Sequence, residues 1–208
     1  MTGDYNDKQI WTENDKTGHL HHFPLKWPKI ESYIPIQKRI VILDFGCGNG
    51  LILKEIGNMN PEAELIGIDV SENALHSAAR VLPRARFLKI EDGSLLPLES
   101  NSIDFIFCSE VIEHILDTEN AFSEISRVLK PGGRILITTP HHGIIKNIII
   151  TLFAFDKHFN PAGPHIRFFS KKSVSRLLKK FGMKAVKWDA FGRFFTVPHS
   201  LIAVAEKK

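Results

Sequence analysis

Short apolar runs alternate with helix-forming segments along the middle of this chain. Five runs of five or six residues are bounded by charged residues, glycine or proline, and they span residues 39–44, 64–69, 86–90, 103–108 and 134–139. Continuous apolar runs of this length are typical of strands that are buried on both faces of a parallel sheet. Right-handed crossovers wind such a series into one sheet with helices on both faces. The pattern therefore predicts a doubly wound α/β fold.

Helices are predicted between and after these strands, at residues 51–58, 72–80, 119–129 and 170–181. Ser71 and Ser170 stand in front of two of them as capping residues. Residues 130–133, Lys-Pro-Gly-Gly, are expected to turn the chain into the fifth strand. Two closing strands are expected at 184–189 and 200–206, and the second has the form of an antiparallel addition. The length of 208 residues fits one domain at 38–208, preceded by an N-terminal arm and helix at 1–37.

The composition excludes several classes of protein. Two distant cysteines, Cys47 and Cys108, have no metal-binding spacing and fit thiols that are kept reduced. The first residues lack the apolar segment of a signal peptide. The longest apolar run, 143–155, contains Lys146 and Asn147 and is shorter than the roughly 20 residues of a membrane span. We therefore expect a cytoplasmic protein, with a peripheral membrane contact as the alternative.

Three glycines, Gly46, Gly48 and Gly50, follow the first predicted strand, where open α/β sheets make their first ligand contact. The dinucleotide fingerprint would need a further glycine at position 51, which is leucine here, so a nicotinamide oxidoreductase is disfavoured. Asp44 precedes the glycines, and Asp69 ends the second strand. A strand-end carboxylate in the place of Asp69 can accept hydrogen bonds from both hydroxyls of a ribose. These residues predict a cleft for a nucleoside.

The segment Val41-Ile-Leu-Asp-Phe-Gly-Cys-Gly-Asn-Gly50 resembles motif I of the class I S-adenosylmethionine-dependent methyltransferases. Residues 67–71, 91–97, 101–106, 110–114 and 129–133 resemble the later motifs of that family in the same order. The resemblance implies a seven-stranded, mostly parallel Rossmann-like sheet with one antiparallel closing strand. It also implies S-adenosyl-L-methionine as cofactor, S-adenosyl-L-homocysteine as product, and cofactor contacts from Asp44, Gly46, Cys47, Gly48, Gly50, Asp69, Val70, Asp92, Gly93 and Glu110.

The resemblance places acceptor chemistry after the fourth and fifth strands. His114, His141 and His142 are candidate bases, because an imidazole with a pKa near 6.5 can take a proton from a hydroxyl during methylation. We therefore expect O-methylation of a small-molecule or lipid-like acceptor, with carbon and nitrogen acceptors on the same scaffold as alternatives. In the plainer interpretation, Glu113 and His114 only cap and orient the local turn.

Residues 140–169 interrupt the alternation and are expected to form an insertion on the acceptor side. Within it, apolar residues at helical spacing predict a helix that buries its stripe on the domain or on a second copy, the stripe being Ile144, Ile145, Ile148, Ile149, Leu152 and Phe153. A lid or an interfacial helix is the alternative. His165 and Arg167 follow in a segment that resembles ubiquinone- and menaquinone-pathway methyltransferases, and they are candidates for a polar contact to the acceptor.

Several partners stay open at this point. The spacing Glu110-x-x-Glu113-His114 also resembles the metal-assisted motif of small-RNA 3′-end 2′-O-methyltransferases and of ubiquinone-pathway O-methyltransferases, which leaves metal use unknown. The net charge of +4 gathers in the basic residues between 171 and 187. Stacking aromatics are nearly absent there, which disfavours nucleic acid as a partner. A nucleic-acid methyltransferase, a non-catalytic cofactor-binding protein and a homodimer remain as alternatives.

Overall fold

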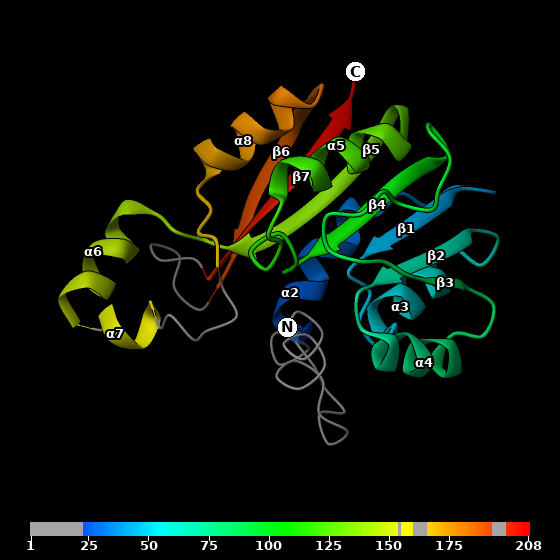
Figure 1. Cartoon of the computed structure of the whole chain (residues 1–208), viewed down its shortest axis with the longest axis horizontal. Helices are drawn as coiled ribbons and strands as arrows, with labels where there is room; N and C mark the ends of the chain where they lie inside the picture. The colour runs from blue at the N-terminus through cyan, green and yellow to red at the C-terminus, as the bar shows by residue number, and fades with distance from the viewer. Residues whose placement is uncertain (1–22, 154, 160–165, 193–198) are drawn as a thin grey trace.

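The computed structural model describes residues 23–153, 155–159, 166–192 and 199–208. Its centre is a seven-stranded sheet with the order β3-β2-β1-β4-β5-β7-β6 (Figure 1). The strands are β1 (Val41–Phe45), β2 (Glu64–Asp69), β3 (Arg86–Lys89), β4 (Ile103–Ser109), β5 (Leu129–Pro140), β6 (Met183–Phe191) and β7 (Ser200–Lys207). Strands β1 to β5 pair in parallel, and β7 is antiparallel to both β5 and β6. This arrangement confirms the predicted fold and its single antiparallel strand.

Helices cover both faces of this sheet (Figure 1). The described helices are α2 (Phe23–Ile30), the 3-10 turn η2 (Glu31–Tyr33), α3 (Leu51–Met59), α4 (Glu72–Val81), α5 (Thr118–Val128), α6 (Ile144–Phe153), α7 (Phe155–His158) and α8 (Lys171–Lys180). Side chains of α5 and α8 pack on one face, and those of α2 and α3 pack on the other. Along β4, Ile106 and Cys108 belong to the first cluster, and Phe105 and Phe107 to the second. This alternation buries the central strands on both faces.

The predicted capping residues begin two of the helices. The hydroxyl of Ser71 accepts a hydrogen bond from the backbone amide of Ala74. The hydroxyl of Ser170 accepts from the amide of Ser173, whose own hydroxyl accepts from the Ser170 amide at 2.9 Å. This reciprocal pair is a capping box, and it satisfies two amides at a helix start.

The fifth strand starts earlier than predicted. It begins at Leu129, so residues 130–133, predicted as a turn, already belong to it. Leu129 pairs with Ile103, and the ladder shifts register before Phe105. The ammonium of Lys130 lies 2.8 Å from each carboxylate oxygen of Asp104 on β4. This ion pair keeps the glycine segment beside its neighbouring strand.

The helix predicted in the insertion is present, but it does not bury its apolar stripe on the domain. The side chains of the stripe are 47% to 82% exposed, whereas Ile150 is buried. The sequence pattern establishes that the helix is amphipathic but not which side faces the protein. Within the described residues, no helix combines the length and the apolar composition needed to cross a membrane.

An arginine on α5 holds the loop between β3 and β4. The carboxylate of Glu124, almost fully buried, accepts a hydrogen bond from the Leu96 amide at 2.8 Å and pairs with the guanidinium of Arg127 at 2.7 Å. The same guanidinium donates to the carbonyl oxygens of Leu96 and Leu98 at 3.0 and 2.8 Å. One side chain therefore anchors a loop without regular structure.

We expect Arg127→Met to lower the free energy of unfolding by about 2 kcal/mol, because the Glu124 carboxylate and two carbonyls lose their donor. Urea unfolding followed by circular dichroism measures this. The control is Arg80→Met on the exposed face of α4, which should change stability by less than about 0.5 kcal/mol. Equal stability of the two variants would contradict an anchoring role for Arg127.

Candidate functional site

A cleft opens at the carboxyl ends of β1, β2, β3 and β4 and encloses about 990 Å³ of space that is continuous with solvent. Its lining comes from the segments that follow these four strands and from the start of α5: Phe45, Gly46, Asp69, Val70, Ile90, Glu91, Asp92, Gly93, Ser94, Leu96, Glu110, Val111, His114, Ile115, Asn120, Ala121 and Glu124. Segments far apart in sequence thus meet where an open α/β sheet binds its ligand.

The glycine turn after β1 forms the floor of the cleft. The amides of Gly46 and Cys47 both donate to the carbonyl oxygen of Ile68 on β2, each at 2.9 Å. Gly46 has φ +79°, and a Cβ atom there would lie 2.4 Å from a methyl carbon of Val111. Only glycine fits such a backbone at such a close approach. Glycine at this position therefore lets the side chain of Val111 pack directly against the turn.

Asp69 connects that turn to the next helix. One carboxylate oxygen accepts from the Gly48 amide at 2.8 Å, and the other accepts from the Ser71 amide at 2.9 Å. Asp69 is thus held at the end of β2, on the wall of the cleft.

Asp44 lies behind the cleft and is not among the described residues that line it. Burial, with a smaller contribution from the negative charge of Asp69, raises the pKa of Asp44 to about 8. Asp44 therefore carries a proton at neutral pH. Cys47, Gly48 and Gly50 lie with it behind the lining, and Gly50 allows the chain to approach Ala78 on α4.

The loop after β3 contributes Asp92 and Gly93 to the wall. The Asp92 carboxylate accepts from the Leu116 amide at 3.0 Å, and the Gly93 carbonyl accepts from the Asn120 side chain at 3.0 Å. These bonds join the loop to the segment after β4. Six of the ten predicted cofactor residues thus line the cleft: Gly46, Asp69, Val70, Asp92, Gly93 and Glu110.

Glu110 follows β4 with a left-handed backbone, φ +56°. Its carboxylate accepts from the hydroxyl of Thr138 on β5 at 2.7 Å and from that of Ser200 on β7 at 3.4 Å. The ammonium of Lys26 on α2 lies 3.4 Å from the same carboxylate. Lys26 is 6% exposed, and its ammonium lies 5.1 Å above the ring centre of Phe191. Four elements therefore meet around one carboxylate.

Sequence reasoning missed Lys26. The residue stands in a short N-terminal segment that contains two prolines and has no clear periodicity. No local pattern distinguishes a buried lysine from the many exposed ones.

Glu113 is buried beside Glu110. Burial, with a smaller contribution from the charge of Glu110, raises the pKa of Glu113 to about 8. One of its carboxyl oxygens accepts from the hydroxyl of Thr139 at 3.1 Å, and the other, Oε1, has no hydrogen-bond partner among the described residues. Its backbone carbonyl accepts from the amides of Ile166 and Arg167, so the residue also orders the later segment.

The three candidate histidines do not share one place. His114 lines the cleft, whereas His141 and His142 are not among its described lining residues. His141 forms a bridge with Phe169, and the His142 amide donates to the Phe169 carbonyl at 3.1 Å. The His142 ring lies 3.2 Å from the side-chain oxygen of Asn147. Pairing with the later segment therefore draws the chain after β5 away from the cleft.

Arg167, a candidate for a polar contact to the acceptor, holds the loop after β4. Its guanidinium donates to the carbonyl of Ile115 at 3.0 Å and to that of Leu116. His165, the other candidate, lies outside the described residues. No group of three or more His, Cys, Asp or Glu side chains that could hold a metal ion occurs in the described part of the chain.

Comparison with known proteins finds a methyltransferase domain in this chain. Residues 43–137 match the model of a methyltransferase domain. The chain is 31% identical over 147 residues to malonyl-[acyl-carrier protein] O-methyltransferase of Hahella chejuensis, covering 69% of this chain and 50% of that protein. It is 27% identical over 161 residues to ubiquinone biosynthesis O-methyltransferase of Coxiella burnetii, covering 74% of this chain and 67% of that protein.

A solved putative methyltransferase from Bacillus halodurans has the same fold, with a TM-score of 0.72 at 14% identity, over 88% of this chain and 98% of that one. The chain spans between 29% and 50% of the length of three curated relatives to which it is 30% to 37% identical. The matched domain contains the strand ends that meet at the cleft, and both domain and fold imply S-adenosylmethionine as cofactor. The chain therefore contains a methyltransferase domain, and its fold is similar to that of the class I S-adenosylmethionine-dependent methyltransferases.

Proposed function

We propose that this protein transfers a methyl group from S-adenosylmethionine to an oxygen atom of a small-molecule or lipid-like acceptor. The observation that carries the proposal is that one cleft joins Gly46 and Asp69 to Glu110 and His114. The first pair suits a nucleoside, and the second supplies groups that can handle a proton. Two relatives bear the names of O-methyltransferases, for a malonyl-[acyl-carrier protein] and in ubiquinone biosynthesis, and these names favour oxygen as the acceptor atom.

The residues present fit the cofactor. The Asp69 carboxylate lies on the cleft wall, where it can accept hydrogen bonds from the ribose hydroxyls, and the Gly46 turn lies beside it. Asp92, on the opposite loop, is the proposed contact of the adenine amine. When bound, the cofactor supplies a methyl group that its sulfonium already makes electrophilic.

The chain itself then has to orient the acceptor and remove its proton. His114 is the proposed proton acceptor, because it is the one of the three candidate histidines that lines the cleft. Glu110 is held by Lys26 and Thr138 and gives that end of the cleft a fixed negative group. Alignment of an acceptor with the methyl carbon can account for about 7–11 kcal/mol of barrier lowering in favourable cases.

We expect Asp69→Asn to weaken the binding of S-adenosylhomocysteine about tenfold or more, because the ribose loses a charged acceptor. Isothermal titration calorimetry measures this. Glu62→Gln, an exposed carboxylate between α3 and β2, is the matched control and should bind as the natural protein does. Equal affinity of the Asp69 and Glu62 variants would remove Asp69 from the proposed cofactor contacts.

The activity itself is tested with tritium-labelled S-adenosylmethionine and a panel of phenols, catechols and alkyl carboxylic acids. We expect label in an ether or ester product. We also expect His114→Ala to lower the turnover number about a hundredfold with unchanged affinity for S-adenosylhomocysteine. His76→Ala, on the exposed face of α4, is the control. Cofactor binding without transfer to any compound would favour the non-catalytic alternative, and full activity of His114→Ala would exclude it as the base.

The raised pKa of Asp44 predicts a pH dependence of stability. Between the ordinary pKa of aspartate and about 8, the folded state holds a proton that the unfolded state has released. The stabilising effect of this proton is present at low pH and is lost as pH rises through the pKa of the folded state. We therefore expect Asp44→Asn to gain stability relative to the natural protein between pH values of about 5 and about 8.

Urea unfolding at both pH values measures this change. Glu113 affects the pH dependence of stability equally in the natural protein and in Asp44→Asn. The difference in free energy of unfolding between the two proteins therefore isolates the contribution of Asp44. A difference that stays constant with pH would contradict a protonated Asp44.

A further inference from the structure

Helix α6 turns polar side chains toward the protein and apolar side chains outward, the reverse of a helix packed on a hydrophobic core. Its two polar side chains near the start, Lys146 and Asn147, lie partly buried on the protein side, and the Asn147 oxygen is 3.2 Å from the His142 ring. The opposite side is apolar and exposed, from Ile144 at 81% to Phe153 at 82%. Apolar side chains gathered on one exposed face mark a binding surface. We call this surface the outer face, and it consists of Ile144, Ile145, Ile148, Ile149, Leu152, Phe153 and Phe155.

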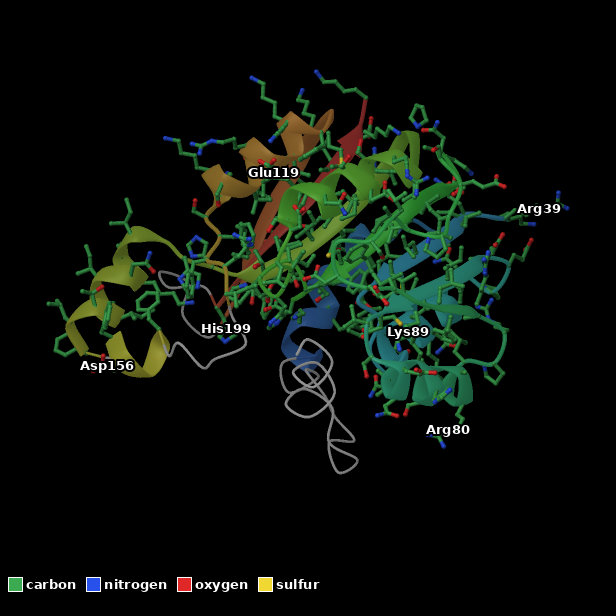
Figure 2. The ribbon with its side chains drawn as sticks, viewed as in Figure 1. Arg39, Arg80, Lys89, Glu119, Asp156 and His199 are labelled. Atoms are coloured by element: carbon green, nitrogen blue, oxygen red, sulfur yellow. The ribbon has the colours of Figure 1, made fainter. Side chains whose placement is uncertain are left out.

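The outer face stands clear of the sheet. Figure 1 shows α6 and α7 projecting from one end of the molecule, beyond the end of β5. In Figure 2, Asp156 on α7 marks that extremity, and Arg39 lies at the other end. Among the described elements, α6 packs chiefly on α7, and Phe155 of α7 is itself 53% exposed. The two helices therefore form a projecting unit with an apolar side.

A basic helix starts beside this unit. The bridge between His141 and Phe169 fixes the start of α6 to the start of α8, so Lys171 is only two residues beyond the point of contact. Helix α8 contains no acidic residue. It has five exposed basic side chains, and β6 adds two more beyond it: Lys171, Lys172, Arg176, Lys179, Lys180, Lys184 and Lys187. One of them, Lys180, pairs with Glu119 at 2.6 Å.

We propose that the outer face inserts into the interfacial region of an anionic lipid bilayer, with the basic residues of α8 against the phospholipid headgroups. Interfacial helices bind through buried apolar area together with attraction to anionic lipids. Each Lys or Arg near such a surface contributes a favourable electrostatic interaction that salt screens. A second copy of this chain would instead bring two sets of the same basic residues toward each other.

The inference does not rest on the proposed methyl transfer, since neither the outer face nor α8 contributes a described lining residue to the cleft. Helix α6 begins four residues after the end of β5 and belongs to the part of the chain that pairs with Phe169.

The test is co-sedimentation of the full chain with two kinds of vesicle. One kind contains equal parts of phosphatidylglycerol and phosphatidylcholine, and the other contains phosphatidylcholine alone. We expect the protein to bind the anionic vesicles about tenfold more tightly, and to lose most of this preference when the salt concentration is raised.

Matched variants separate the two parts of the surface. Ile145→Gln/Leu152→Gln changes the outer face and should lower binding to anionic vesicles about tenfold or more. The control Ile36→Gln/Leu95→Gln changes one isoleucine and one leucine elsewhere on the protein that are 71% and 74% exposed, and it should bind normally.

A second pair of variants tests the basic residues. Lys172→Gln/Arg176→Gln should reduce the preference for anionic lipid, whereas the control Lys38→Gln/Lys54→Gln, which changes two exposed lysines outside α8, should not.

Three outcomes would overturn the proposal. The natural protein would fail to sediment with anionic vesicles, or the outer-face variant and its control would bind the vesicles equally. In the third outcome, the natural protein would not bind vesicles but would form a dimer in analytical ultracentrifugation, and Ile145→Gln/Leu152→Gln would dissociate that dimer. The last would assign the surface to a second copy. Binding of S-adenosylhomocysteine, measured by calorimetry on the same variants, should not change. The lipid test and the proposed methyl transfer can therefore fail separately.

Discussion

Two backbone amides at the end of β1 share one carbonyl oxygen at the end of β2, and the cleft depends on this contact. The amides of Gly46 and Cys47 bend the chain sharply toward Ile68, which brings the Gly48 amide to the carboxylate of Asp69. Because the strands are parallel, their carboxyl ends meet at one edge. The turn, the acid of β2 and the loops after β3 and β4 are thereby placed around one volume.

Two buried carboxyl groups beside this volume have raised pKa values. Asp44 lies near Asp69, and Glu113 lies near Glu110, and in each case burial raises the pKa of the more enclosed acid to about 8. In each pair, the partner that lines the cleft has polar contacts: two backbone amides for Asp69, and Lys26 with Thr138 for Glu110. In each pair, the more buried acid therefore has the raised pKa, and the other acid lines the cleft and makes the polar contacts.

Features that repeat along the chain were predictable from sequence, and features that depend on distant contacts were not. The strands could be located because a strand buried on both faces needs a continuous apolar run, and helix starts could be located from Ser71 and Ser170. The turn after β1 was predictable because a left-handed backbone needs glycine. His142 was expected to face the cleft, but pairing with Phe169, 27 residues later, turns it elsewhere. The direction of α6 likewise depends on contacts beyond its own sequence.

The residues around the cleft extend beyond the span of the chain that matches the methyltransferase domain. The family match begins at residue 43, yet the cation that balances Glu110 stands at position 26, on a helix whose last residue, Ile30, is packed in the same core as β1. A protein shortened to its matched span would keep the glycine turn and Asp69 but would leave a partly enclosed carboxylate without its counter-ion. The segment ahead of the first strand therefore helps to set the charge inside the cleft, although it lies outside the matched domain.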